Sequence, residues 1–401
     1  MATKKFSDAE WQKITALFNQ SASDFGLPER RDKSVIIGTF NIRKLGKVSN
    51  RSEQSWTLLK SIIGRFDLLA IQEVMDDLSG LEHLCSLLGD DYGMVVSDVT
   101  GVKPGEPGNP ERLAFLFNWK RIKRTALASD ITYDRSNIAN NLYNNRADYN
   151  DAWVEHTSRL KAWKKKVAEK KAQGKRPPSK PPIELPHFVS FIRQPHYVSF
   201  QVLGDNGAAP YEFLVVNAHL LYGIEKEERE WEFMALLDWL TVRAKQTDKL
   251  YHPNLMLLGD CNLDFDSNTT VMRNEIDARI KTLNKTVLKS KKSATANFPI
   301  LTPHPANGVI RTALRQKQTY DQIGLFSHDK RLPVPDDNAT AGTKSDGYNY
   351  GVFNLADLIA KALYQKSITD ITKQQQTKIF KKAEFDISDH MPVWIRLEKP
   401  S

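Results

Sequence analysis

Five short segments of the chain join an apolar run to polar side chains of the types used in catalysis. Apolar runs of this length between turn residues are typical of buried strands. Because several strand ends can meet at one place in a fold, the carboxylates, amides and imidazoles at these positions predict one shared site. The segments are Thr39-Phe40-Asn41, Gln72-Glu73-Val74, Val216-Asn217-Ala218-His219, Gly259-Asp260-Cys261-Asn262 and Ser388-Asp389-His390.

The order of apolar patterns along the chain predicts a layered α/β domain with mixed sheets. Ser7 followed by Glu10 fits a capping box at the start of a first helix. Strands and helices then alternate irregularly, which indicates mixed sheets packed in layers. Helices are predicted at Gln54–Ile63, Glu225–Ala244 and Leu355–Tyr364. Strands are predicted at Ser34–Ile42, Phe66–Val74, Tyr92–Ser97, Leu113–Asn118, His187–Ile192, Tyr197–Leu203, Phe213–His219, Asn254–Asp260, Tyr320–Phe326 and Pro392–Leu397.

The length of 401 residues allows one large domain or two small ones. We expect an N-terminal helical extension over residues 1–33 and a single domain over residues 34–398. A basic helical insertion is expected at about residues 131–186, and its proline-rich end should return in an extended form. A second insertion between core strands is expected from Asp266 to Gln318.

The positive charge of the chain is concentrated in one segment. The formal net charge is +9, and Arg159–Lys180 alone holds ten lysines and arginines against one acid, Glu169. The local excess of 10 − 1 = +9 equals that of the whole chain. This segment favours a polyanionic partner, although a charge run of this kind is also commonly a solvated helical face.

The sequence contains no apolar run of the ~20 residues that a membrane span needs. No apolar stretch follows the charged N-terminus, so no secretory signal is expected. The only two cysteines are Cys85 and Cys261, which makes a disulfide framework improbable. We therefore expect a protein of the reducing cytoplasm.

Two of the strand ends carry oxygen-rich side chains suited to metal and phosphate chemistry. Glu73 ends an apolar run and can bind Mg²⁺, although a single acid at such a place more often caps or solvates a strand end. Asp260 and Asn262 follow Gly259, and at a spacing of two they point the same way on an extended chain. They can orient a water and hold a phosphate oxygen, or they can form an ordinary Asx turn.

Two histidines and two arginines complete the candidate set. His390 needs a carboxylate to fix its tautomer, and Asp321 is the best candidate partner. His219 ends another strand, and Glu111 or another acid can orient it. A pair of histidines with plausible carboxylates favours function over structure. Arg112 and Arg193 are candidate phosphate ligands, and structural salt bridges are as probable for each.

In their order along the chain these motifs resemble the endonuclease/exonuclease/phosphatase superfamily, and within it the deoxyribonuclease I branch. The resemblance spans most of Ser34 to Leu397, and Glu-Arg and Arg-Gln-Pro tilt it toward that branch. It rests on Phe40-Asn41-Ile42-Arg43, Ile71-Gln72-Glu73-Val74, Glu111-Arg112-Leu113-Ala114-Phe115-Leu116-Phe117, Phe191-Ile192-Arg193-Gln194-Pro195, Ala218-His219, Leu258-Gly259-Asp260-Cys261-Asn262, Tyr320-Asp321-Gln322-Ile323 and Ser388-Asp389-His390-Met391-Pro392-Val393.

The resemblance implies a four-layer α/β sandwich, in which two packed mixed sheets are flanked by helices. It also implies roles for the site residues. Glu73, Asn41 and Asp389 would bind the divalent metal, with Asn41 also near the substrate. Asp260 and Asn262 would position the water and the scissile phosphate. The two dyads would be His219 with Glu111 and His390 with Asp321, and Arg112 and Arg193 would contact phosphate.

The chain departs from the deoxyribonuclease pattern at several points. Met75 stands where that nuclease has an arginine, which puts one DNA-backbone contact in doubt. Cys261 replaces an aromatic residue beside the site. The disulfides of the secreted enzyme have no counterpart, and the insertion at about residues 131–186 is foreign to it.

The function expected from these residues is hydrolysis of DNA by a metal-dependent endonuclease without strong sequence specificity. Mg²⁺ is the expected cofactor, and Mn²⁺ is possible. The alternatives are a phosphomonoesterase or phospholipid phosphodiesterase on the same scaffold, and an inactive nucleic-acid-binding protein. As a hypothesis, the segment Arg159–Lys180 is an accessory clamp for DNA. The sequence leaves the oligomeric state open.

Overall fold

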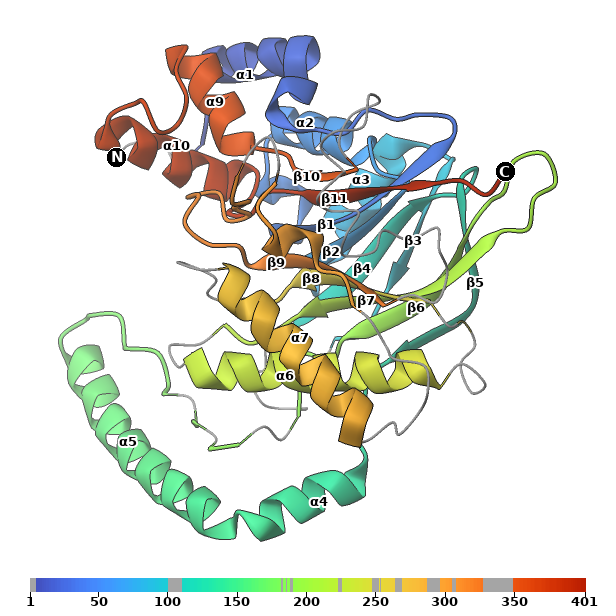
Figure 1. Ribbon diagram of the computed structural model, residues 1–401. Helices are drawn as coiled ribbons and strands as arrows, with labels where there is room; N and C mark the ends of the chain where they lie inside the picture. Colours follow the sequence, from blue (N-terminus) through green and yellow to red (C-terminus); the bar gives the residue numbers. More distant parts are fainter. Residues whose placement is uncertain are drawn as a thin grey trace.

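Two mixed β-sheets packed face to face form the centre of the molecule, and helices cover the outer face of each sheet (Figure 1). This computed structural model describes residues 5–99, 110–181, 183–184, 186–187, 190–222, 226–246, 252, 254–263, 269–286, 296–304, 308–326 and 349–401. The fold is the four-layer α/β sandwich expected from the sequence.

The first sheet has the strand order β10-β11-β1-β2-β4-β3. Only β1 and β2 run parallel, and the other neighbours pair antiparallel. Its strands are β1 (Ser34–Leu45), β2 (Leu68–Met75), β3 (Tyr92–Val96), β4 (Glu111–Asn118), β10 (Tyr350–Val352) and β11 (Val393–Glu398).

The second sheet has the order β5-β6-β7-β8-β9, and its one parallel pair is β7 with β8. Its strands are β5 (Ile122–Asp130), β6 (His196–Val202), β7 (Tyr211–His219), β8 (Leu255–Asp260) and β9 (Asp321–Phe326). The described helices are α1 (Asp8–Ser21), α2 (Glu53–Ile63), α3 (Ser79–Leu88), α4 (Arg135–Asn144), α5 (Arg146–Ala172), α6 (Lys226–Lys245), α7 (Thr269–Thr286), α9 (Leu355–Tyr364) and α10 (Lys373–Asp386).

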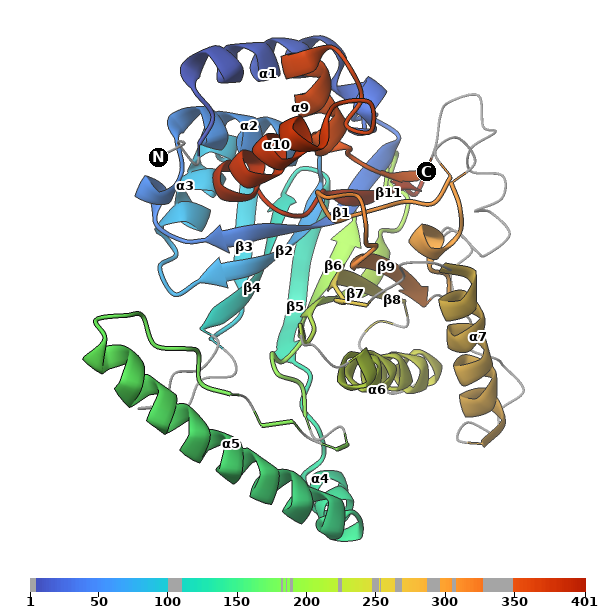
Figure 2. The ribbon, with the colours of Figure 1, turned by 90° about the vertical axis from the view of Figure 1, so that its left-hand side faces the viewer.

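The two-residue alternation of each strand divides the apolar side chains among three layers. In β1, Val35 and Ile37 point between the sheets, whereas Ile36 and Phe40 point toward the helices. The outer layer over the first sheet comes from α1, α2, α3, α9 and α10, and α6 and α7 cover the second sheet (Figures 1 and 2). The central strands β1, β2, β4, β7, β8 and β9 are therefore buried on both faces, which explains their near-continuous apolar runs in the sequence.

The structure confirms the predicted strands except one. His187–Ile192 is not a strand where the structure describes it, at residues 187 and 190–192. The backbone N–H of Ile192 donates to the Glu232 carboxylate instead of to a neighbouring strand. Strand β5 was not predicted because it is an edge strand whose side chains alternate weakly and are largely exposed.

Helix α7 lies inside the stretch that was expected to be a second insertion. Met272, Ile276 and Ile280 of this helix are buried in the layer between α6 and the second sheet. Their spacing of four residues places them on one helical face. At least this part of Asp266–Gln318 therefore belongs to the outer layer of the sandwich.

Helices α4 and α5 interrupt the connection between β5 and β6 and project from the body as an arm, defined here as residues 131–187 (Figure 2). His156 is the only residue of the two helices that is buried. No described helix combines the length and the apolar character needed to cross a bilayer. Cys85 and Cys261 are free thiols.

Candidate active site

The candidate residues continue the face of each strand that packs between the two sheets. In β7, His219 follows Phe213 and Val215 at two-residue steps. In β8, Asp260 follows Met256 and Leu258 in the same way. At one end of the sandwich the inner layer therefore changes from apolar to polar side chains. Because these side chains stand on strands of the packed core, their positions are held rigidly.

A ladder of buried amides joins the two sheets directly behind these residues. Thr39 Oγ1 donates to Gln72 Oε1 over 3.1 Å, and Gln72 Nε2 donates to Asn217 Oδ1 over 2.6 Å. Asn217 Nδ2 in turn donates to the backbone carbonyls of Ile71 and Ala114 in the first sheet. The polar residues that precede the site in three of the five sequence segments thus fix the separation of the sheets.

Two imidazole–carboxylate pairs converge on Asp260. His219 Nδ1 lies 3.0 Å from Glu111 Oε2, and its Nε2 lies 3.7 Å from Asp260 Oδ2. His390 Nδ1 lies 2.8 Å from Asp321 Oδ2, and its Nε2 lies 3.5 Å from the same oxygen of Asp260. Adjacent strands create this convergence, because Asp260 pairs in register with His219 on one side and with Asp321 on the other.

The charges of this cluster are set by the neighbours of each group. Burial lowers the pKa of His390, but the charges of Asp321 and Asp260 outweigh burial and raise it well above its ordinary value. Burial raises the pKa of Asp260, but the two histidines and two hydrogen bonds lower it further than burial raises it. For Glu111, His219 and Arg193 likewise overcome burial and lower the pKa to about 2. His390 is thus held as a cation beside Asp260, whose pKa is lowered, and Asp321, whose pKa burial raises.

Glu73 reaches this site through an irregularity of the backbone. Its φ is +58°, and the pairing of β2 shifts register here with both neighbouring strands. A non-glycine residue in this region is strained and persists only when its surroundings hold it. Asn41 Nδ2 donates to Glu73 Oε1 over 3.2 Å, and the backbone N–H of Lys44 donates to Oε2 over 3.0 Å. The bulge turns the carboxylate toward Asn41.

Unused oxygen atoms of Asn41 and Asp389 fit a hard divalent cation. Asn41 donates to both Glu73 and Asp260, yet its buried Oδ1 has no hydrogen-bond partner among the described residues. Asp389 Oδ1 is also buried without a hydrogen-bond partner among the described residues, and Asp389 Oδ2 lies 3.8 Å from Arg43 Nε. Carboxylate and amide oxygens are ligands that Mg²⁺ and Mn²⁺ prefer.

A second set of possible ligands lies deeper in the same site. Ligand atoms of Asp260, Asp321 and His390 lie within 4.8 Å of one another. His390 is already paired with both carboxylates there, so a cation at this place would have to displace a protonated imidazole. Glu73 and Asn41 therefore form the better candidate metal site.

Replacing Glu73 with glutamine is expected to weaken Mg²⁺ binding by tenfold or more, because it removes a carboxylate ligand while keeping the shape of the side chain. Isothermal titration of Mg²⁺ into the protein measures this change without substrate. Asp321→Asn serves as the contrasting variant. If Asp321→Asn abolishes Mg²⁺ binding and Glu73→Gln does not, the cation belongs to the deeper set.

The two arginines lie in different places. Arg193 is buried, with Nε 2.6 Å from Glu111 Oε2, and it donates to the backbone carbonyl of Leu220 over 3.2 Å. It thus braces the Glu111–His219 pair. Arg112 points to the opposite face of β4 from Glu111, where it donates to the Ser97 carbonyl and pairs with Asp98. The structure does not bring Arg112 into contact with the other candidates.

Asn262 closes the turn that follows β8. Its φ is +49°, and its backbone N–H donates to Asp260 Oδ1 over 3.0 Å. Its side-chain Nδ2 donates to the Leu220 carbonyl over 3.0 Å, just beyond His219. Gly259 permits the close approach of β7, because a Cβ there would lie 2.0 Å from the Ala218 carbonyl oxygen.

Glu232 of α6 is a site-supporting residue that was not singled out from the sequence. Its buried carboxylate accepts the backbone N–H of Ile192 over 2.7 Å and also that of Leu221. These two N–H groups belong to the segments that carry Arg193 and His219. The signal was present, because Glu232 precedes buried Leu236 and Leu240 at four-residue steps on the apolar face of its helix.

The stability that Glu232 contributes is expected to fall as pH rises. Burial raises the pKa of Glu232 from 4.5 to about 7. A raised pKa means that the folded state holds the proton more tightly. The contribution is therefore complete below pH 4.5 and is lost as pH rises through about 7. The loss amounts to about 3 kcal/mol.

Urea unfolding of wild type and Glu232→Gln between pH 4.5 and 8 measures this effect, since glutamine does not ionise. The free energy of unfolding of wild type relative to the variant should fall across this range. Glu227→Gln, at an exposed position of the same helix, should show no such trend. A wild-type-minus-variant difference that stays constant with pH contradicts the assignment.

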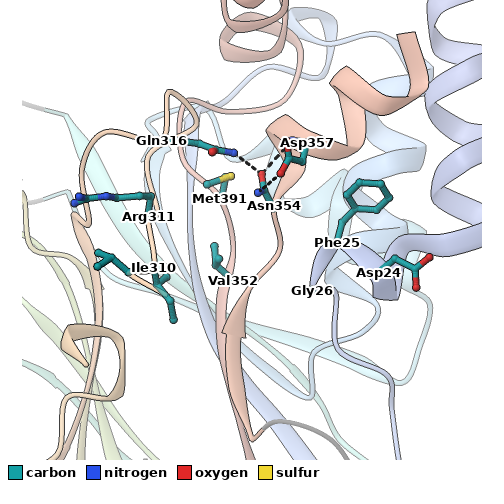
Figure 3. A pocket seen from close by; sticks show the side chains of 11 residues that line it. Asp24, Phe25, Gly26, Ile310, Arg311, Gln316, Val352, Asn354, Asp357 and Met391 are labelled. Atoms are coloured by element: carbon teal, nitrogen blue, oxygen red, sulfur yellow. Dashed lines mark hydrogen bonds between the residues drawn. The ribbon is translucent and has the colours of Figure 1, made fainter. Parts of the chain in front are cut away.

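A pocket of about 240 Å³ lies behind the His390 segment (Figure 3). Met391 lines it, together with Asn354 and Asp357 at the start of α9. Three of its polar side chains are bonded to one another, since Gln316 donates to Asn354 over 2.7 Å and Asn354 donates to Asp357 over 2.8 Å. These bonds anchor α9 beside the site, so we assign the pocket a structural role.

No family model matches this sequence, and none of the curated proteins matches it. Solved structures do show similarity. An endonuclease/exonuclease/phosphatase family protein from Bacteroides thetaiotaomicron has a TM-score of 0.45 at 13% identity, over 91% of this chain and 95% of that one. The proteins of similar structure thus include a member of the endonuclease/exonuclease/phosphatase family. The catalytic domain of human Nocturnin has a TM-score of 0.42 at 12% identity, over 92% and 96%. Truncated Caenorhabditis elegans TDP2 has a TM-score of 0.42 at 11% identity, over 91% and 97%.

Proposed function

We propose that this chain is a divalent-metal-dependent phosphodiesterase that hydrolyses DNA as an endonuclease without strong sequence specificity. The observation that carries the proposal is the convergence of His219 and His390 on Asp260, each backed by its own carboxylate. The unused amide oxygen of Asn41 beside Glu73 supplies the place for a cation.

Asp260 is proposed to orient the attacking water. Its neighbours keep it ionised, and Asn41 and the backbone of Asn262 fix both of its oxygens. The water oxygen forms the new bond to phosphorus while the bond from phosphorus to the leaving oxygen breaks. The proton of the water passes to the carboxylate, and no covalent intermediate is required.

His390 is proposed to bind a phosphate oxygen as a cation and to supply a proton to the leaving oxygen. Asp321 holds its Nδ1, which leaves Nε2 directed at the centre of the site. His219, oriented by Glu111, stabilises the charge that develops on the phosphate. When bound at Glu73, Asn41 and Asp389, Mg²⁺ or Mn²⁺ supplies charge neutralisation at the phosphate and at the leaving oxygen.

Cleavage of supercoiled plasmid tests the proposal, with linear duplex, single-stranded DNA and RNA in parallel. Each substrate is incubated with Mg²⁺, with Mn²⁺ and with EDTA. Nicking that requires a divalent metal supports the endonuclease function. Absence of cleavage of every nucleic acid, together with hydrolysis of a phosphomonoester or a phospholipid, would assign the site to one of those substrates instead.

We further propose a reducing, cytoplasmic setting, with which the two free thiols agree.

A further inference from the structure

The arm leaves the body at the active-site end of the second sheet. Asp130, the last residue of β5, pairs with His196, the first residue of β6, and His196 pairs in turn with Asn217. Asn217 precedes His219 by two residues on β7. The returning chain also passes Arg193, which pairs with Glu111. A nucleic-acid strand that extends from the site in this direction can therefore reach the base of the arm.

The base of the arm is fixed to the body by specific contacts. His196 Nδ1 lies 2.8 Å from Asp130, and the Tyr133 and Phe191 rings lie 5.4 Å apart. Further out, His187 Nε2 lies 3.0 Å from Asp148 Oδ2, and its ring stacks on Trp231 of α6. The arm is thus anchored at several points, and its position relative to the site is defined.

One side of α5 is covered by the returning chain. Trp163 donates through Nε1 to the Pro178 carbonyl over 2.9 Å, and Arg159 pairs with Glu184. The remaining sides of α5 face solvent. Nine of the ten basic residues between 159 and 180 are exposed: Lys161, Lys164, Lys165, Lys166, Lys170, Lys171, Lys175, Arg176 and Lys180. Among the described residues, none of these nine forms an ion pair.

The arm combines this charge with exposed aromatic rings. Tyr143 and Trp153 are 68% and 62% exposed, although large rings are normally buried. Trp153, Lys164 and Lys171 fall on one stripe of α5, because 11 and 18 residues are close to whole numbers of helical turns. From Trp153 to Lys171 this stripe is about 27 Å long, the length of about eight base pairs of duplex.

We propose that the α4–α5 arm binds the phosphate backbone of a nucleic acid whose scissile segment lies in the active site. This inference rests on the proposed phosphodiesterase function. The lysines neutralise phosphates without reading sequence, and Trp153 stacks on a base where the strand is single. A membrane-surface helix would need an apolar face along its length. Lys164, Lys165 and Lys166 instead occupy successive directions around the second half of α5, and the apolar Leu160, Trp163 and Val167 on its remaining side are partly buried, with Trp163 donating to the returning chain.

The test compares two triple variants that remove equal charge from exposed helical lysines. Lys164, Lys165 and Lys171 are changed to glutamine in the arm. Lys13, Lys60 and Lys361 are changed to glutamine in α1, α2 and α9, on the helical layer over the first sheet. Glutamine keeps nearly the helix propensity of lysine, and circular dichroism verifies the helices.

Binding of a fluorescein-labelled 30-nucleotide duplex and of the matching single strand is measured by anisotropy in EDTA, across a range of salt concentrations. The arm variant should bind the duplex at least tenfold more weakly, and the slope of log K against log salt should fall by up to about 3. The control variant should retain the wild-type slope. Trp153→Ala should weaken single-strand binding by about fivefold or more and duplex binding less.

Three results would overturn the proposal. The first is an equal change of slope in the arm and control variants. The second is wild-type DNA binding by the arm variant. The third is arm-dependent binding of phosphatidylserine vesicles without arm-dependent binding of DNA. Hydrolysis of bis(p-nitrophenyl) phosphate, which is too small to reach the arm, reports on the site alone. Arm-dependent DNA binding by a chain that hydrolyses no phosphodiester would reject the proposed function and retain the arm.

Discussion

Replacing His219 with alanine is expected to lower the rate of plasmid nicking by about 10²–10⁴-fold while the protein stays folded. His219 joins Glu111 to the buried oxygen of Asp260 that also faces His390. Its loss removes a donor from the place where the phosphate gains charge. It also removes a group that lowers the pKa of Asp260, so the water-orienting carboxylate loses electrostatic support.

The measurement is initial-rate nicking at saturating metal, with circular dichroism and a thermal melt of the same preparation. His252→Ala is the matched control. His252 is also buried and faces an acid, with Nδ1 3.4 Å from Glu212, but it precedes β8 and so lies at the opposite end of that strand from Asp260. Similar rate losses in both variants would show that the effect comes from packing and not from chemistry.

Replacing Asp67 with asparagine is expected to lower the free energy of unfolding by about 3–5 kcal/mol. The carboxylate of Asp67 is fully buried at the start of β2, beside β1. It pairs with Arg30, lies 2.8 Å from Arg121 Nε, and accepts the backbone N–H of Ile36 over 2.8 Å. Asparagine keeps the shape but leaves two guanidinium groups without their counter-charge.

Urea unfolding followed by fluorescence measures this loss. Asp91→Asn provides the comparison, because its ion pair with Lys120 spans 2.8 Å but both side chains are largely exposed. Such surface pairs contribute about 0–1 kcal/mol. If the two variants lose equal stability, the two arginines near Asp67 must be satisfied by solvent in its absence, and the buried pair is not a main support of the first sheet.

The core of the fold was predictable from sequence because a strand that is buried on both faces consists of consecutive apolar residues. Each central strand reads as an apolar run, such as Phe213–Val216 of β7, and the polar residue at its end is visible at once. Edge strand β5 carries no such run, since its outer side chains are exposed. The prediction of a strand at His187–Ile192 was wrong because an apolar residue there is buried without being part of a sheet. Phe191 is apolar because it packs beside Tyr133, in a segment of irregular backbone.

The sequence predicted which residues make up the candidate site better than it predicted which of their atoms come into contact. Spacing identified His219, Asp260 and His390 as strand-end residues, but it could not show that both imidazoles face the same oxygen of Asp260. Glu111 and Arg193 lie 82 residues apart in sequence and 2.6 Å apart in space. Arginine and glutamate at such a separation carry no local signal. The sequence likewise left open whether Arg193 meets substrate or braces a carboxylate.

The sequence by itself determined which residue types stand at the ends of buried strands, and it determined that the positive charge lies in one segment. Both are local properties, because burial selects apolar side chains and solvent tolerates lysines wherever they occur. Only the tertiary structure decided which ends meet and which way each side chain turns. Strand order brings Asp260 between His219 and Asp321, and a bulge with positive φ aims Glu73 at Asn41. These outcomes depend on pairing between distant segments, for which no single stretch of chain holds the information.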